Sequence, residues 1–403
     1  MTTVELTLGA PAAGGGFVAR DENGRVIFVR HGISGERVLA RLTEEHPKWA
    51  RAEVTTVLEP SPNRVAPPCP AAGAGKCGGC DYQHIALPEQ RVIKAQLLSE
   101  QLRRTAKIDI DVSVESVSHD DTGLGTRTRV RFGVDEDGAL GMRRTRSHDL
   151  VAVDTCLLAI QEIQNLDLGD DVWPLGVDVQ VFSLGDDAQP SISFVRSSRD
   201  DDSPVDGPEI SEDGPSIHYT TVGDLDYQVS SESFWQIHRR APEVLVNTVL
   251  DQLHLKPGDH VLDLYCGAGL FTKAAAVAVG PTGRVTGIDS SSASVEDARI
   301  NLSEQLWANV VDAQVSGESV APYLDEITAV VLDPPRNGCD RDALIELCGV
   351  NTVTRIVSVS CDAATFARDT RILLDHGWTL TSLRVFDLFE MTEHMECVGT
   401  FTR

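Results

Sequence analysis

The sequence has little positive charge for its length. Its 403 residues include 35 Lys and Arg against 61 Asp and Glu, a formal net charge of -26 at pH 7. Phosphate binding normally requires a basic footprint, so this total on its own argues against a nucleic-acid partner. The acidic residues are unevenly spread, because fourteen of them accompany only two arginines between Gln161 and Ile217. We interpret the run RDDDSPVDGPEISEDGP in this stretch as a solvated acidic insertion.

The basic residues gather instead in two short segments, RTRVRF and MRRTR. Alternation along a strand would place Arg127, Arg129 and Arg131 on one face. Such a face suits contact with phosphate, although a solvated strand edge fits the pattern equally well. The second segment contributes Arg143, Arg144 and Arg146.

Long apolar runs are also missing. No stretch approaches the roughly 18 to 20 apolar residues of a membrane span. The N-terminus, MTTVELTLGAPAAGGG, lacks the basic start and apolar run of a signal peptide. We therefore expect a cytoplasmic protein without membrane contact, and we expect a monomer.

A disulfide framework is not indicated, because the nine cysteines are odd in number and spread over a long chain. Three of them, Cys69, Cys77 and Cys80, lie within twelve residues in CPAAGAGKCGGCDYQH. A C-x-x-C pair with a third thiolate nearby suits zinc or an iron–sulfur cluster, and the spacing does not choose between them. Cys156 is the expected fourth ligand, with His84 as its competitor.

The chain divides into three segments. Residues 1 to 60 alternate short strands with Gly-rich turns, which predicts a small antiparallel β-barrel. Residues 61 to 232 form a strand-rich α+β central domain with the cysteine loop, a helix over 88 to 104 and the acidic insertion. Residues 233 to 403 alternate β-branched strands with helices, which predicts a Rossmann-like α/β domain with a parallel sheet.

A glycine-rich turn marks a ligand site in the last segment. In VLDLYCGAGLFT a buried strand ends at Asp263 to Tyr265, and Gly267 and Gly269 open the next helix. The following strand ends in Asp289, twenty residues after Gly269, the spacing at which a carboxylate meets ribose hydroxyls. The pattern is not G-x-G-x-x-G, so a dinucleotide is disfavoured. D-x-x-x-G-x-G resembles the first motif of class I S-adenosylmethionine methyltransferases, whereas the alternative is a tight turn that binds no nucleoside.

Two further strand ends belong to the same expected crevice. VVLDPPRNG places Asp333 before two prolines that form a rigid lip. VSVSCDAATFARD places Cys361 between a strand and a helix start, where partial positive charge favours the thiolate. A buried, inert thiol is the commonest state of a free cysteine. A thiolate with a carboxylate such as Glu396 beside a methyl donor suits carbon methylation of a pyrimidine, in which the thiolate adds to C6 and a base later removes the C5 proton.

The segments DLYCGAG, LDPPRNG, SCDAATFARD and HMEC, in this order, resemble the RNA uracil-C5 methyltransferase family. The resemblance implies an RNA substrate and S-adenosyl-L-methionine as cofactor. It implies that Cys361 is the catalytic nucleophile and Glu396 the catalytic base. The cofactor contacts that it implies are Gln236 of SFWQIH, Tyr265, Asp289 and Asp333. The two glycines of the turn, Gly267 and Gly269, belong to the same cofactor site.

The chain departs from the family pattern at two positions. Ala363 replaces the proline that usually follows the Asp or Asn after the nucleophile. Leu270 occupies a position where many relatives have a polar cofactor contact. Neither change removes a catalytic group, but Leu270 removes one expected contact to the cofactor.

The N-terminal part of the chain also resembles known modules. Residues 1 to 60 look like a TRAM domain, an RNA-binding barrel. Relatives with this C…C-G-G-C loop and a distant fourth cysteine hold a [4Fe-4S] cluster, which implies the ligands Cys69, Cys77, Cys80 and Cys156 here, with zinc as the alternative.

The sequence leaves the RNA open. We favour 23S rRNA and rank the T-loop uridine of tRNA second, with contact through the barrel and the Arg127 to Arg146 region. Two other functions stay possible: N-methylation of a base or protein at the Asp-Pro-Pro lip, and a non-catalytic RNA-binding iron–sulfur protein.

Overall fold

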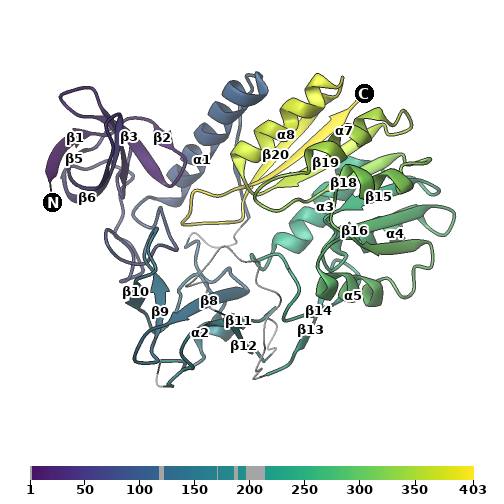
Figure 1. Ribbon diagram of the computed structural model, residues 1–403, viewed down its shortest axis with the longest axis horizontal. Coiled ribbons are helices and arrows are strands. Elements are labelled where there is room, and N and C mark those ends of the chain that lie inside the picture. The colour runs from purple at the N-terminus through teal and green to yellow at the C-terminus, as the bar shows by residue number, and fades with distance from the viewer. Residues whose placement is uncertain (1, 118–121, 170, 186–188, 197–213) are drawn as a thin grey trace.

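The computed structural model describes the chain except for residue 1 and residues 118–121, 170, 186–188 and 197–213. The barrel lies at one end of the long axis and the C-terminal α/β domain at the other (Figure 1). Most of the predicted acidic run, residues 199–215, falls outside the described residues. Within the described residues, no helix is both long and apolar enough to cross a membrane.

The N-terminal segment forms the expected small β structure. Its strands pair in the order β1-β5-β6-β4-β3-β2, and all neighbours are antiparallel except β4 and β6, which are parallel. Alternate side chains such as Ile27 and Val29 are fully buried, so one face of each strand makes the core. The strands are β1 (Thr3–Thr7), β2 (Pro11–Ala12), β3 (Gly16–Arg20), β4 (Val26–Arg30), β5 (Arg37–Glu45) and β6 (Trp49–Glu59).

The central segment contains an antiparallel sheet and a hairpin. The sheet has the order β10-β9-β8-β11-β12, and the hairpin pairs β13 with β14. The elements are β8 (Arg129–Val134), β9 (Leu140–Arg143), β10 (Leu150–Ala152), α2 (Gln161–Gln164), β11 (Val177–Phe182), β12 (Ser191–Arg196), β13 (Ile217–Val222) and β14 (Leu225–Ser230).

Two elements of the predicted central domain pack on the C-terminal domain instead. Helix α1 (Leu87–Gln101) continues into a π-helical turn, Leu102–Ala106, and its apolar side chains share a core with α8. Strand β7 (Glu115–Ser116) pairs in parallel with β20 at the edge of the C-terminal sheet. The tertiary contacts of this helix and this strand therefore connect two segments that the sequence pattern separates.

The C-terminal domain is built on an eight-stranded sheet in the order β17-β16-β15-β18-β19-β21-β20-β7. Strands β17 to β19 in this order are parallel, and β21 runs antiparallel between β19 and β20. The strands are β15 (His260–Leu264), β16 (Arg284–Asp289), β17 (Ala308–Asp312), β18 (Ala329–Leu332), β19 (Arg355–Ser360), β20 (Thr379–Asp387) and β21 (Glu396–Thr402). The helices are α3 (Ala241–Leu253), α4 (Leu270–Val279), α5 (Ser292–Asn301), α6 (Gly317–Val320), α7 (Arg341–Gly349) and α8 (Ala363–Asp375), with a 3-10 turn at Ala321–Tyr323.

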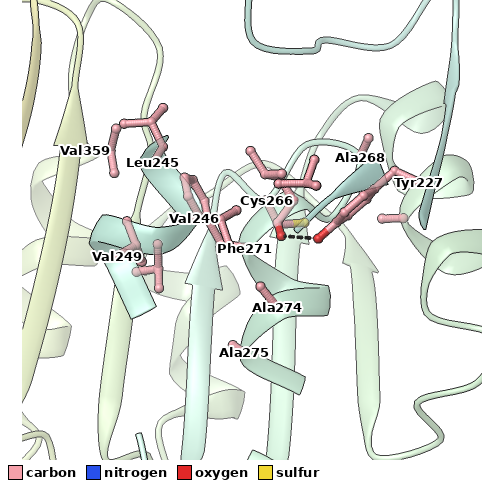
Figure 2. Close-up of a cluster of buried hydrophobic side chains, with 14 of the residues drawn as sticks. Tyr227, Leu245, Val246, Val249, Cys266, Ala268, Phe271, Ala274, Ala275 and Val359 are labelled. Carbon is pink, nitrogen blue, oxygen red and sulfur yellow. Dashed lines mark hydrogen bonds between the residues drawn. The ribbon is translucent and has the colours of Figure 1, made fainter. Parts of the chain in front are cut away.

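Helices cover both faces of this sheet, which explains why its strands read as continuous apolar runs. Val330 and Val331, neighbours on β18, are both fully buried although they point to opposite faces. On one face Leu245 and Val249 of α3 pack near Phe271 of α4 (Figure 2). Apolar side chains pack on both faces of the sheet and fix the parallel strands, so that their carboxyl ends lie together at one end of the sheet.

A buried ion pair fixes α1 to the C-terminal sheet. The Lys94 ammonium, fully buried, donates to Asp387 Oδ1 at 2.5 Å and to the Phe389 carbonyl at 3.0 Å. Burial lowers the pKa of Lys94, while Asp387 acts in the opposite direction. Removal of one partner from such a pair leaves the other charge buried and uncompensated.

We expect Lys94→Ala to lower the free energy of unfolding by about 3–5 kcal/mol, because Asp387 loses its buried counter-ion. Urea unfolding followed by circular dichroism measures the change. Arg103→Ala is the control, because it removes an exposed pair with Glu100 in the same helical region, and the midpoint should not move. Equal midpoints for the two variants would contradict a stabilising role for the pair.

Candidate active site

The carboxyl ends of the parallel strands bring the expected acidic residues together. Asp289 closes β16, and its Oδ2 accepts the Gly267 N–H at 2.9 Å, which ties the glycine turn to the next strand. Tyr265 has a left-handed φ of 64°, and its N–H donates to the Ile288 carbonyl at 2.8 Å. The turn and Asp289 therefore form one hydrogen-bonded unit, and Asp333 follows β18 on the other side of β15.

A buried carboxyl group, Asp263, and a partly buried one, Asp333, lie beside this turn. Asp263 Oδ2 accepts the Thr272 hydroxyl at 2.5 Å, while its buried Oδ1 has no hydrogen-bond partner among the described residues. Burial raises the pKa of Asp263 to about 7. Gln236 Nε2 donates to Asp333 Oδ2 at 3.1 Å, and burial raises the pKa of Asp333 to about 7. The unpaired oxygen of Asp263 and the Gln236 amide suit a ligand with an ammonium and a carboxylate group.

A cavity of about 590 Å³ opens at the same edge of the sheet. It is lined by Tyr265, Ser290 and Gln314, which follow β15, β16 and β17, and by Pro335 of the Asp-Pro-Pro segment. Its volume lies within the range of about 300–1,000 Å³ for small-molecule sites. Sequence reasoning missed Ser290 and Gln314, although each lies one or two residues after a parallel strand that ends in Asp.

Leu270 does not line this cavity. Its side chain is buried in the core, and its carbonyl accepts the Tyr227 hydroxyl at 2.9 Å. The departure from the family pattern at this position therefore exchanges a polar contact for core packing.

Cys361 lies where the sequence predicted, between β19 and the start of α8. Asp362 is the N-cap of α8, and its carboxylate accepts the N–H groups of Ala364 at 3.0 Å and Thr365 at 2.8 Å. Ala363 takes the first helical position, where proline is often found because its φ is already helical. The Asp362 cap fixes the helix start in the absence of that proline.

Glu396 is the first residue of β21, which pairs with β19, the strand that ends just before Cys361. In the antiparallel pairing of β19 with β21, Ser360 is opposite Cys397, so the two candidate catalytic residues occupy adjacent positions at the same end of these strands. Glu396 is buried, and this burial, followed by the nearby Asp333, raises its pKa well above the usual range. The register therefore brings together a thiol and a carboxyl that are far apart in the sequence.

The surroundings of Cys361 act against the activation that the helix start predicts for its thiol. Burial, followed by the nearby Glu396 and Asp333, raises the pKa of Cys361 to about 12, while Arg336 acts in the opposite direction. Desolvation and acidic neighbours both disfavour a thiolate. These surroundings therefore favour the thiol form of Cys361.

The comparisons with known proteins agree with this geometry. A family model described as tRNA (Uracil-5-)-methyltransferase matches residues 220–403, and a TRAM domain model matches residues 2–55. An uncharacterized RNA methyltransferase of Streptomyces coelicolor is 39% identical, over 98% of this chain and 92% of its own. A 23S rRNA (uracil(1939)-C(5))-methyltransferase of Acinetobacter baylyi is 30% identical, over 95% of this chain and 90% of its own. The chain belongs to the RNA (uracil-C5)-methyltransferase family.

Members of this family use S-adenosylmethionine, and the fold agrees with that assignment. The chain resembles the crystal structure of Pyrococcus abyssi tRNA (uracil-54, C5)-methyltransferase in complex with S-adenosyl-L-homocysteine. The TM-score is 0.71 at 21% identity, and the match covers 99% of this chain and 100% of the other. At this identity the match supports the fold, including the class I methyltransferase domain and the TRAM barrel.

The structure does not support the predicted metal centre. The four predicted ligands are free, partly buried thiols: Cys69, Cys77, Cys80 and Cys156. Burial, and then the nearby Cys156 and Cys69, raise the pKa of Cys77. In the part of the chain that the structure describes, no group of three or more His, Cys, Asp or Glu is arranged to hold a metal ion. The Nε2 of the competing ligand His84 lies 2.9 Å from the Gly32 carbonyl oxygen, so one of its two ring nitrogens already has a partner.

The predicted basic strand face is only partly available to RNA. The Arg129 side chain stacks over the Phe182 ring and donates to the Ser233 carbonyl at 2.8 Å, and burial lowers its pKa to about 10. Arg143 forms a two-bond ion pair with Asp178. Arg131, Arg144 and Arg146 are exposed.

The raised pKa of Cys361 predicts a steep pH dependence of its alkylation. Only the thiolate reacts with iodoacetamide, and its fraction rises about tenfold per pH unit below the pKa. We expect the rate at Cys361, followed by peptide mass spectrometry on the RNA-free protein, to keep rising from pH 7 to pH 10. A rate that reaches its plateau near pH 7 would show an activated thiolate and contradict the effect of burial.

Proposed function

We propose that the chain methylates C5 of one uridine in 23S rRNA through a covalent bond between Cys361 and C6. The observation that carries the proposal is the register of β19 and β21, which brings Cys361 and Glu396 to neighbouring strand ends beside Asp333. A nucleophile, a base and a methyl-donor crevice at one sheet edge are what carbon methylation of a pyrimidine requires. The enzyme acts as a cytoplasmic monomer in this proposal.

Each catalytic residue has a defined task. The Cys361 thiol gives its proton to water, and its sulfur bonds to C6 of the uracil while the C5–C6 π bond breaks, which makes C5 nucleophilic. Bound S-adenosylmethionine supplies the electrophilic methyl group. Glu396 then takes the proton from C5, the C5–C6 double bond reforms and the sulfur leaves as thiolate. A carboxyl whose pKa is raised by burial is a stronger base once ionised, which suits this proton transfer.

The remaining predicted residues form the cofactor site in this proposal. Gln236 and Asp263 hold the amino-acid end, and Asp289 meets the ribose hydroxyls. Tyr265, with Gly267 and Gly269 in the turn, forms one wall, and Asp333 closes the crevice toward Cys361. The hydrogen bond from Gln236 to Asp333 supports this arrangement, because it connects the cofactor end of the crevice to the catalytic end.

We expect Cys361→Ser to abolish release of tritium from [5-³H]-uridine RNA, because a hydroxyl does not add to C6 at a useful rate. Glu396→Gln should instead form a covalent RNA adduct that persists on a denaturing gel, since elimination needs the C5 proton to leave. Cys348→Ala is the matched control. The Cys348 thiol is buried. The backbone carbonyl of Cys348 accepts a hydrogen bond from Arg403, which follows β21 at the end opposite Glu396, so this variant should keep full activity.

Tritium release also separates this reaction from N-methylation, which leaves the C5 hydrogen in place. Methyl transfer without tritium release would favour an N-methyltransferase. Full tritium release by Cys361→Ser would refute the thiolate mechanism.

The choice of 23S rRNA rests on the relatives. The Acinetobacter baylyi protein is named for uracil 1939 of 23S rRNA, at 30% identity over nearly all of both chains. The tRNA enzyme of Pyrococcus abyssi, at 21% identity, makes tRNA the second candidate. Mass spectrometry of 5-methyluridine mapped to position in RNA from a deletion strain tests the choice, and loss confined to tRNA would reverse it.

We also retain a [4Fe-4S] cluster on Cys69, Cys77, Cys80 and Cys156 as a proposal, with zinc as the alternative. The proposal is supported by the spacing of the three loop cysteines. It is also supported by Cys156, which lies near enough to Cys77 to raise its pKa. Anaerobically purified protein should contain iron and acid-labile sulfide, and Cys80→Ser should lose both. Zinc without iron would select the alternative, and absence of both metals would refute the proposal.

A further inference from the structure

The loop that leads to Glu396 is held by parts of the chain some 300 residues away. This loop, residues 388–395, joins β20 to β21. The Met391 carbonyl accepts the N–H groups of Asp81 at 2.8 Å and Tyr82 at 2.9 Å, and the Met391 N–H donates to Gln90 Oε1 at 2.9 Å. The position of the candidate base therefore depends on the segment after the barrel and on α1.

Glu393 extends this contact into the barrel itself. Its Oε2 accepts the Gly14 N–H at 2.6 Å and the Gly15 N–H at 3.0 Å, so one carboxylate oxygen binds both amides of the turn between β2 and β3. Both glycines have left-handed φ values, 92° and 69°. A Cβ at Gly15 would lie 2.5 Å from the Asp81 carboxyl group, so this close approach requires glycine.

Charged side chains complete the contact. Asp81 Oδ2 accepts the Glu393 N–H at 3.2 Å, and Asp81 Oδ1 accepts the Arg30 guanidinium of β4 at 2.8 Å. Arg30 also donates to the Gly14 carbonyl at 3.4 Å. The barrel turn, the cysteine-loop segment and the catalytic loop thus share one hydrogen-bonded cluster that is partly shielded from water.

The same turn lines the space in front of Cys361. A groove of about 60 Å³ is bounded by Ala13 of the barrel turn, Leu97 and Gln101 of α1, Cys361 and His394. The barrel turn is therefore one wall of the space in front of the thiol.

We propose that Glu393 is a positioning residue that clamps the Ala13–Gly15 turn over Cys361, so that the barrel forms a wall of the target-base pocket and sets the position of Glu396. The proposal rests on the proposed C5 methylation and deepens it, because it makes the barrel part of the catalytic pocket as well as a contact for RNA. Glu393 acts through Glu396 and the pocket wall and does not itself react with the base.

We expect Glu393→Ala to lower the methylation rate at saturating RNA at least tenfold and to change the Kd for RNA less than threefold. A denaturing gel of quenched reactions should show a larger steady-state fraction of the covalent adduct, because misplacement of Glu396 slows elimination more than addition. Glu393→Gln should recover most of the rate, since its amide oxygen still accepts the two N–H groups.

Gly15→Ala tests the same contact from the barrel side and should reproduce the slow elimination, because its Cβ collides with Asp81. Glu22→Ala, an exposed barrel carboxylate, is the control and should behave as wild type. Thermal unfolding of each variant identifies a mere loss of fold, which would lower rate and adduct together.

Failure of this proposal is distinct from failure of the proposed function. If the wild type forms no adduct with uridine RNA, the covalent mechanism fails. If the wild type forms the adduct and both Glu393→Ala and Gly15→Ala match its rate and adduct fraction, only the positioning role of Glu393 is refuted.

Discussion

The site depends on acidic groups that are buried together at the carboxyl ends of parallel strands. Asp263 and Glu396 are buried and Asp333 is partly buried, and burial raises the pKa of each carboxyl. The same burial, together with two of these carboxyls, raises the pKa of Cys361. A cation in the crevice would favour the ionised forms of all four groups. The burial that raises the pKa of the carboxyls therefore also disfavours the thiolate form of Cys361.

Much of the C-terminal domain could be predicted because its signals are local. The strand before Asp263, the glycine turn and the Asp at the end of the next strand each occupy a short window, and parallel strand ends must meet at one edge. Cys361 and Asp362 were likewise predictable as a strand end followed by a helix start. The N-cap bonds of Asp362 show why this helix start does not need the usual proline.

Other features depend on contacts that no local pattern records. The burial of Arg129 against Phe182 removes it from the basic face that its spacing predicts. The pKa of Cys361 depends on burial and on acidic neighbours from other strands, which the local pattern of a helix start does not contain. The contact of Glu393 with Gly14 spans 379 positions, and PAAGGG reads as an ordinary turn until the fold brings it to the catalytic loop.

The most direct test of the covalent mechanism uses RNA in which 5-fluorouridine replaces the target uridine. Fluorine at C5 cannot leave as a proton, so the methylated base should stay bonded to the enzyme. Peptide mass spectrometry of the wild-type complex should place the RNA fragment and one added methyl group on the peptide that contains Cys361. An adduct on another cysteine, or methylated RNA with no adduct at all, would contradict the account.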